Sequence, residues 1–360
     1  MVAALVTAAR GDSGADAVRP AAGSADADPQ TAPEPPDAAE PPVEQPVPSP
    51  KPPPRPITLA FAGDVHAEAE SGAALRAGLP TLGDTLAAAD VTVVNMEAAI
   101  TERGERVGKQ YAFRAPAETL IVLKDAGVDV VNLANNHGLD FGQQGLRDTL
   151  AASAATGLPT IGIGADEDQA YAPHVAVVDG QRIAVIGATQ VLDSSLIEPW
   201  TAGPGKPGLA SAKREQRLVE AVSTARAEAD VVVVYLHWGR ERDACPLPRQ
   251  QALARALVDA GADVVVGSHA HVLLGGGYLG DAYVDYGLGN FIFYARPGEG
   301  AKTGVLTLTL QGRTVTASQW TPAVIRSGAP VLLEGSAAEA ARQDKDSRRQ
   351  CTDLTAASAG

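Results

Sequence analysis

The central part of the chain alternates between amphipathic stretches and short Val-rich runs. The runs include residues 91–94, 128–133 and 264–266, and each follows a stretch with the spacing of a helix. Glycines such as Gly127 lie between the predicted helix and the strand that follows it, where a helix C-cap is needed. A continuous Val-rich run is typical of a strand that is covered on both faces. The pattern therefore predicts a layered α/β protein.

The pattern changes after Gly276. The segments "YLGDAYVDYGLGNFIF" and "TGVLTLTLQGRTVTASQWTP" alternate apolar and polar residues between Gly turns, as antiparallel strands do. The sheets are therefore expected to be mixed. From Ser327 the sequence is rich in Ala and charged residues, and we expect residues 327–360 to form a polar tail.

The first 56 residues contain almost nothing that a core could bury. Residues 31–56 read "TAPEPPDAAEPPVEQPVPSPKPPPRP", a composition typical of a disordered spacer. This predicts a leader over residues 1–56 and a globular domain over residues 57–326. The opening "MVAALVTAAR" is either the remnant of a signal peptide that starts upstream or a disordered end. A Pro-rich tether behind such a start favours an extracytoplasmic protein, secreted or held at the cell surface.

The chain is acidic, with a formal net charge of −14. It has no basic stripe, which argues against nucleic acid or an anionic membrane surface as a partner. No apolar run has the length of a transmembrane helix.

Polar side chains follow the predicted strands at the points where the strands end. Five of the six histidines occupy such positions, and only His174 lies elsewhere. In open α/β sheets the loops beyond the carboxyl ends of the strands line the ligand crevice, so these side chains are expected to converge. They are Asp64, His66, Glu97, Asn136, His137, His237, His269 and His271.

The chemistry of this set points to metal ions. It combines carboxylates, imidazoles and one carboxamide without a thiolate, which suits Mn, Fe, Zn or a similar divalent ion. Leaving His137 aside, seven donors are more than the roughly four or five that one zinc-like ion takes. They fit two ions better, and paired ions about 3.5–4 Å apart are a recurrent device for hydrolysing phosphate esters.

Each motif also has an ordinary explanation. His237 beside Trp238 could be a packed core pair, and "NNH" could be an Asn-rich turn, because Asn tolerates the left-handed conformation. Packing does not readily explain why all of them stand at strand ends of one alternating fold. The joint pattern therefore favours a dinuclear metal site.

The motifs together resemble the CapA family, the capsule and poly-γ-glutamate biosynthesis proteins related to calcineurin-like metallophosphatases. The matching segments are "FAGDVH", "VVNMEAAIT", "YAFRAP", "DVVNLANNHGLDFG", "YLHWGRE", "GSHAHV" and "YGLGNFIF", in the order of the family. The resemblance covers roughly residues 57–326. It implies a four-layer αββα sandwich of two mixed sheets packed face to face, with the helices outside.

The resemblance also implies roles for individual residues. One ion would be held by Asp64, His66, Glu97 and His271. Glu97 would bridge to a second ion, held also by Asn136, His237 and His269. His137 would lie over the substrate, where it could protonate a leaving oxygen or stabilise developing charge. Asp140 could orient His137, or it could be a helix N-cap.

The sequence departs from the pattern at three positions. Many metallophosphatases bridge their metals with an Asp, whereas this chain has Glu97. Many CapA-like proteins have an apolar residue at the position of His66. Ala270 replaces the Pro that is often found between the last two histidines. None of these excludes metal binding.

Several other side chains have a possible place around the site. Arg114 and Arg240 could bind an anionic substrate, although for each the favoured alternative is a solvated surface arginine. Asn290 is expected to shape a loop near the metals, and Glu241 to support a ligating histidine.

Three functions are compatible with these features. The first is a metal-dependent hydrolase that acts on a phosphoester or on an amide bond of a cell-envelope polymer. The second is a component of capsule assembly or export that binds polyglutamate through its metals without turnover, with membrane proteins of capsule synthesis as partners. The third, a purely structural surface protein, leaves the strand-end donors unexplained.

The chain has two cysteines, Cys245 and Cys351. They could form one disulfide, which an extracytoplasmic location permits. Alternatively they are unrelated, with Cys245 partly buried near the site and Cys351 free. Metal ligation by either is not expected, because the other donors already fill two sites.

Overall fold

The structure, a computed structural model, describes residues 54–79 and 82–359. The predicted leader over residues 1–56 therefore lies almost wholly outside the described residues. Within the described ranges, no helix has the length and apolar character needed to cross a membrane.

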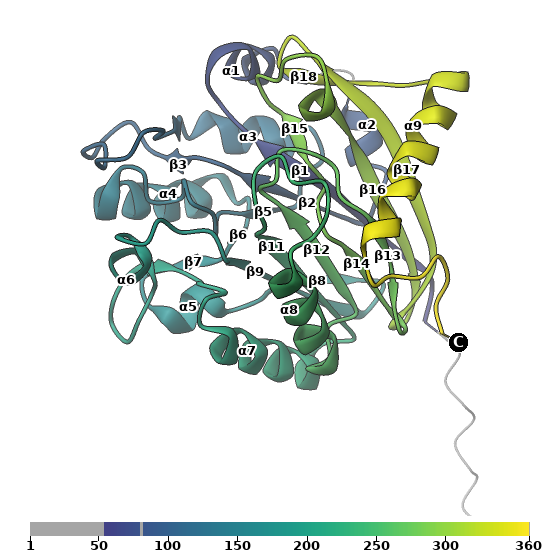
Figure 1. Cartoon of the computed structure of the whole chain (residues 1–360). Helices are drawn as coiled ribbons and strands as arrows, with labels where there is room; N and C mark the ends of the chain where they lie inside the picture. Colours follow the sequence, from purple (N-terminus) through teal and green to yellow (C-terminus); the bar gives the residue numbers. More distant parts are fainter. Residues whose placement is uncertain (1–53, 80–81, 360) are drawn as a thin grey trace, which may run out of the picture. The chain divides into compact units, whose positions relative to one another are not determined.

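Two large mixed sheets form the centre of the fold (Figure 1). The first has the strand order β18 (Ala329–Leu332), β17 (Thr314–Arg326), β16 (Lys302–Gln311), β1 (Ile57–Val65), β2 (Val91–Met96), β5 (Val130–Asn132) and β6 (Thr160–Ile161), with β15 (Asn290–Ile292) also paired to β1. The second has the order β13 (Gly276–Leu279), β14 (Ala282–Asp285), β12 (Val264–Ser268), β11 (Val231–His237), β9 (Gln181–Thr189) and β8 (His174–Val178). Each sheet contains parallel and antiparallel pairs, as predicted.

The sheets pack against each other, and helices cover their outer faces. One apolar cluster joins Phe61 and Val93 of the first sheet to Val233 and Val266 of the second. The next residue along β11, Val234, belongs instead to a cluster with the outer helices, because successive side chains of a strand point to opposite faces. This confirms the predicted four-layer arrangement.

The outer layers are made by six main helices. The first sheet is covered by α1 (Ala69–Arg76), α3 (Glu118–Asp125) and α4 (Gly142–Thr156), and the second by α7 (Glu215–Glu228) and α8 (Pro248–Asp259). The sixth, α9 (Gly335–Ser347), lies beside β17 (Figure 1). The remaining elements are short: α2 (Gly83–Leu86), α5 (Glu167–Tyr171), α6 (Ile197–Trp200), β3 (Ala99–Ile100), β4 (Arg114–Ala115), β7 (Ile163–Gly164), β10 (Gly208–Leu209), η1 (Glu299–Ala301) and η2 (Arg348–Cys351).

Residues 327–359 differ from the predicted polar tail. Strand β18 pairs with β17 and so extends the first sheet, and helix α9 follows it. The buried residues of α9 are only Ala338 and Lys345, so the helix has no apolar stripe that the sequence pattern could reveal. The predicted boundary at residue 326 therefore does not mark the end of the folded body.

Cys245 and Cys351 form a disulfide, with their Cα atoms 5.7 Å apart and a sequence separation of 106. The bridge confirms the first of the two alternatives and ties the C-terminal segment to the loop after β11.

Reduction of this disulfide is expected to lower the melting temperature. Closing a loop of this length constrains the unfolded chain by about 4–5 kcal/mol in the entropic account. Thermal melting with and without a dithiol reductant, beside thiol counting on denatured protein, measures the effect. The Cys245→Ser/Cys351→Ser variant should melt at the temperature of the reduced protein, and two free thiols in the unreduced protein would contradict the bridge.

Candidate metal centre

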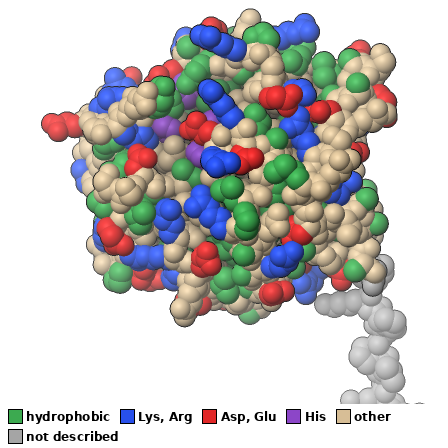
Figure 2. Space-filling view, in the orientation of Figure 1, with side chains coloured by type: hydrophobic (Ala, Val, Ile, Leu, Met, Phe, Trp, Pro, Cys, Tyr) green, Lys and Arg blue, Asp and Glu red, His purple; other side chains and the backbone are tan. Residues whose placement is uncertain are grey.

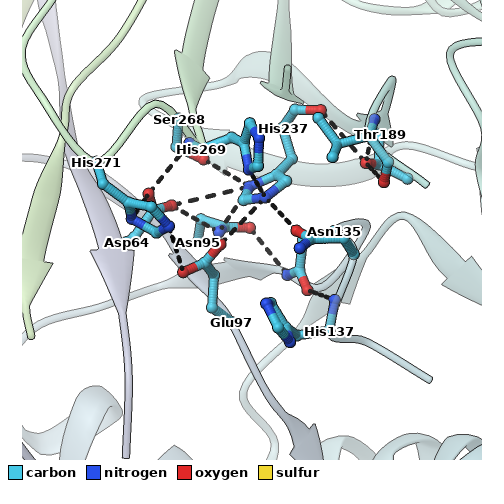
Figure 3. Close-up of polar contacts among 12 residues, drawn as sticks. Asp64, Asn95, Glu97, Asn135, His137, Thr189, His237, Ser268, His269 and His271 are labelled. Atoms are coloured by element: carbon cyan, nitrogen blue, oxygen red, sulfur yellow. Dashed lines mark hydrogen bonds and ion pairs between the residues drawn. The ribbon is translucent and has the colours of Figure 1, made fainter. Parts of the chain in front are cut away.

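Five of the predicted donors converge where the carboxyl ends of strands from both sheets meet (Figure 3): Asp64, Glu97, His237, His269 and His271. Asp64 is the penultimate residue of β1 and lies opposite Asn95 of β2, while His237 ends β11 opposite Ser268 of β12. The two sheets are joined nearby by the Tyr235 hydroxyl, which donates to the Ala62 carbonyl at 2.7 Å. The polar residues at the carboxyl ends of β1, β2, β11 and β12 therefore lie together where the two sheets meet.

Five of the donors form two groups of three that share one carboxylate. Asp64, Glu97 and His271 make up the first group, and Glu97, His237 and His269 the second, and within each group the ligand atoms lie within 4.8 Å of one another. His237 Nε2 lies 3.1 Å from Glu97 Oε1, and His271 Nε2 lies 3.8 Å from Oε2. Glu97 is thus placed between two prospective ions.

Asn136 completes the second group. Its Oδ1 lies 2.8 Å from His237 Nε2, within reach of an ion held by that nitrogen. The histidine-rich face is accessible: His271 is partly exposed, and Figure 2 shows histidine side chains reaching the surface beside acidic and basic ones.

His66 lies near the site but joins neither group. Its ring packs against Phe113, Phe293 and Tyr294 at centroid distances of 4.3, 5.1 and 4.7 Å. Its Nδ1 accepts a hydrogen bond from the Glu68 amide at 3.2 Å. A ligand role for His66 stays a prediction.

The unpaired polar atoms of the site fit a cation. Glu97 Oε1 and Oε2 and His66 Nε2 are buried, and none has a hydrogen-bond partner among the described residues. A buried carboxylate that accepts no hydrogen bond is costly, and a positive ion between the donor groups lowers that cost. The donor set has the carboxylate, imidazole and amide chemistry of a divalent transition-metal site.

Neighbouring side chains orient the ligating rings. His237 Nδ1 lies 3.1 Å from Ser268 Oγ and 3.2 Å from Asn95 Nδ2, which leaves Nε2 facing the donors. His271 Nδ1 lies 2.8 Å from Asn290 Oδ1. Such contacts fix the orientation and tautomer of a metal-binding histidine.

Burial prepares most of these histidines to act as neutral ligands. It lowers the pKa of His237 to about 3 and the pKa of His269 well below its usual value. Burial also lowers the pKa of His271, but the carboxylates of Glu97 and Asp64 outweigh it and leave that pKa raised. Burial and the charge of Glu97 raise the pKa of Asp64 to about 6.

His137 stands beside the donors with its ring held from one side. Its Nδ1 lies 2.7 Å from Asp140 Oδ2, which also accepts a hydrogen bond from the Phe113 amide at 2.7 Å. Two roles were predicted for Asp140: to orient His137 or to cap a helix. The N-cap residue of α4 is Phe141, and Asp140 contacts His137, so the structure shows the first role. Burial lowers the pKa of His137 to about 3 and raises the pKa of Asp140 to about 6.

The sequence match identifies the family. Residues 58–295 match the family described as "Bacterial capsule synthesis protein PGA_cap". The chain belongs to this family.

Curated relatives carry corresponding names. The chain is 37% identical over 192 residues to "Capsule biosynthesis protein CapA" of Bacillus anthracis, covering 52% of this chain and 46% of that protein. It is also 37% identical over 209 residues to "PGA biosynthesis protein CapA" of Bacillus subtilis, covering 57% and 54%. The chain thus spans about half the length of the curated relatives it matches.

A solved phosphatase from Mycoplasma pneumoniae aligns with 75% of this chain and 94% of its own, at 15% identity and a TM-score of 0.46. At that score the similarity is distant, and membership of the PGA_cap family rests on the sequence match.

Two residues predicted to bind substrate lie at the surface of this PGA_cap chain. Arg114 stacks over the Phe141 ring at 5.0 Å, and Arg240 pairs with Asp243 at 2.6 Å. Neither hydrogen-bonds a donor residue of the site. Their role toward a substrate stays a prediction.

Lys109 is a site residue that sequence reasoning missed. Its Nζ lies 2.6 Å from Asp140 Oδ1 and 3.3 Å from His137 Nδ1, and it donates to the Asn136 carbonyl. Lys109 therefore contacts one carboxylate oxygen of Asp140, while His137 contacts the other. Its place in an irregular loop gives no periodic signal.

A network of asparagines was missed as well. Asn95 Nδ2 donates to Asp64 Oδ1 at 2.8 Å, and Asn95 Oδ1 accepts from Asn132 Nδ2 at 2.8 Å and Asn135 Nδ2 at 3.2 Å. The run of asparagines at the ends of β2 and β5 was the available signal. The network leaves Asp64 Oδ2 facing His271 at 3.5 Å.

Proposed function

We propose that this chain is a metal-dependent hydrolase that holds two divalent ions and cleaves a phosphoester within capsule or poly-γ-glutamate biosynthesis. The observation that carries the proposal is Glu97, a buried carboxylate shared by two three-donor groups, with neither oxygen hydrogen-bonded by a described residue. Such an arrangement is costly without cations and suited to a pair of them.

Asp64, Glu97 and His271 would hold one ion, and Glu97, His237, His269 and Asn136 the other. Two ions of Mn, Fe, Zn or similar type supply Lewis acidity toward an ester oxygen and lower the pKa of water.

His137 moves a proton at Nε2. Its Nδ1 is engaged by Asp140, which fixes the ring and stabilises the charged form when Nε2 is protonated. Burial keeps the ring neutral in the substrate-free protein, because its pKa is lowered to about 3. An anionic ester beside the ring favours the charged form, so the ring would take up a proton from solvent at Nε2 when substrate binds and pass that proton to the leaving oxygen.

The setting proposed for this activity is outside the cytoplasm, beside an anionic polymer. The names of the relatives support capsule or polyglutamate as the context. The disulfide between Cys245 and Cys351 and the Pro-rich sequence of residues 31–56 support an extracytoplasmic location.

A second candidate is metal-dependent binding of polyglutamate without turnover. The relatives' names favour it, because they describe biosynthesis rather than hydrolysis. Membrane proteins of capsule synthesis are the partners expected on either proposal.

The two candidates separate in one experiment. The full chain is loaded with Mn²⁺ or Zn²⁺ and assayed with p-nitrophenyl phosphate and bis-p-nitrophenyl phosphate, with and without a chelator. We expect turnover that the chelator abolishes and added metal restores. Absence of turnover on both esters, together with metal-dependent binding of polyglutamate, would contradict the hydrolase and support the binding component.

A further inference from the structure

The two adjacent histidines of the site have an unusual backbone. His269 has φ of 94° and His271 has φ of 55°, both in the left-handed region. Residues other than Gly rarely adopt this region, and they keep it only where the surrounding structure holds them. The loop that carries both ligands therefore depends on contacts from elsewhere in the chain.

Asp64, Arg242 and Asn290 hydrogen-bond residues 269–271 directly. The part of the loop that follows His271 is held by residues 335–355, which we call the C-terminal strap. Lys345 Nζ donates to the Leu274 carbonyl at 2.6 Å, and Arg348 Nη1 donates to the Leu273 carbonyl at 2.7 Å. Arg349 Nε donates to the Gly276 carbonyl at 2.8 Å. Three cationic side chains thus hold the carbonyls that follow His271 in sequence.

The strap also reaches the other two loops that support the histidines. Lys345 Nζ lies 3.4 Å from the Gly287 carbonyl, and the segment after Gly287 carries Asn290, whose Oδ1 holds His271 Nδ1. Cys351 is bridged to Cys245, in the loop that follows His237. The strap is therefore attached both to the loop after β11, which follows His237, and to the loop after β12, which carries His269 and His271.

Ordinary packing does not account for this attachment. The Lys345 side chain is only 6% exposed and is paired with the fully buried Asp285 at 2.8 Å. A buried ion pair is a weak way to stabilise a helix, because the cost of removing both charges from water offsets their attraction. The pair does fix the position of the helix, because the Lys345 ammonium must reach Asp285 and the carbonyls of Leu274 and Gly287 at the same time.

We propose that the C-terminal strap positions the metal-site loops, with Lys345 and Arg348 as the positioning residues. This inference rests on the proposed metal site, and it assigns to Lys345 and Arg348 the role of keeping the ligand-bearing loops in place. The strap lies after residue 295, where the family match ends.

The test compares three full-length variants by Mn²⁺ affinity, measured by calorimetry, and by hydrogen exchange of residues 264–276 in the metal-free protein. Lys345→Met and Arg348→Met remove contacts to the histidine loop. Arg342→Met is the matched control, because Arg342 lies on the same helix as Lys345 and, among the described residues, forms an ion pair only with Glu339. We expect Arg348→Met and Lys345→Met to bind Mn²⁺ about tenfold or more weakly and to exchange faster in this loop, and the control to match wild type.

If Lys345→Met does not fold, because it leaves Asp285 uncompensated, Arg348→Met and reduction of the disulfide in the wild-type protein carry the test. Folded strap variants with wild-type affinity and wild-type exchange would overturn the proposal. A wild-type chain that binds no Mn²⁺ would refute the proposed function instead, and the strap proposal would then stand or fall on the exchange of residues 264–276 alone.

Discussion

Replacing Glu97 by Gln is expected to empty both metal sites and to reduce hydrolysis to the level of the chelated protein. The carboxylate is the one side chain common to the two donor groups, and its oxygens lie 3.1 Å from His237 Nε2 and 3.8 Å from His271 Nε2. A Gln of nearly the same volume keeps the packing but removes the negative charge that two cations share. Metal content should fall from about two equivalents to well below one.

The control for this variant is Glu118→Gln, the same chemical change at an exposed position of α3. It should keep the full metal content. Elemental analysis of both variants after identical reconstitution measures the outcome. Retention of one full equivalent by Glu97→Gln would show that Glu97 serves a single ion, and retention of two would exclude it from the site.

His137→Ala is expected to lower turnover by roughly 10²–10⁴-fold while the metal content stays near that of the wild-type protein. The ring is fixed by Asp140 at 2.7 Å and belongs to neither donor group, so its loss removes proton transfer but no ligand. Turnover of an aryl phosphate and metal content should be measured on the same preparation.

His174→Ala is the matched control, because His174 is the one histidine of the chain that does not lie at the carboxyl end of a strand; it is the first residue of β8. It should leave both quantities unchanged. Loss of metal together with activity in His137→Ala would make His137 a ligand, and unchanged turnover would remove it from the reaction.

The sequence was most informative where apolar runs end in polar residues. Strands β1, β2, β11 and β12 were predicted because a strand buried on both faces must be apolar throughout. Asp64 and His237 lie at the carboxyl ends of β1 and β11, and Glu97 and His269 directly follow β2 and β12. Their convergence could therefore be inferred from topology alone. The sharing of Glu97 came only from the resemblance to a family.

Other parts of the fold could not be predicted from a regular pattern. Lys109 reaches Asp140 from an irregular loop, so no spacing connects the two residues. Helix α9 is attached through Lys345 and its hydrogen bonds, and a sequence rich in Ala and charge therefore looked like a tail.

The β8–β9 hairpin was overlooked although a signal was present. Asp179 and Gly180 form its turn, with φ of 48° and 80°. Positive φ at both central residues is typical of an Asp-Gly hairpin turn between strands. Here the pattern was adequate and the prediction was incomplete.

The central claim is that Glu97 lies between two metal ions, and anomalous diffraction from crystals grown with Mn²⁺ tests it most directly. The account predicts two anomalous peaks about 3.5–4 Å apart, one beside Asp64 and His271 and the other beside His237 and His269, with the Glu97 carboxylate touching both. A map without a peak among these donors, or with a single peak that Glu97 does not touch, would contradict it.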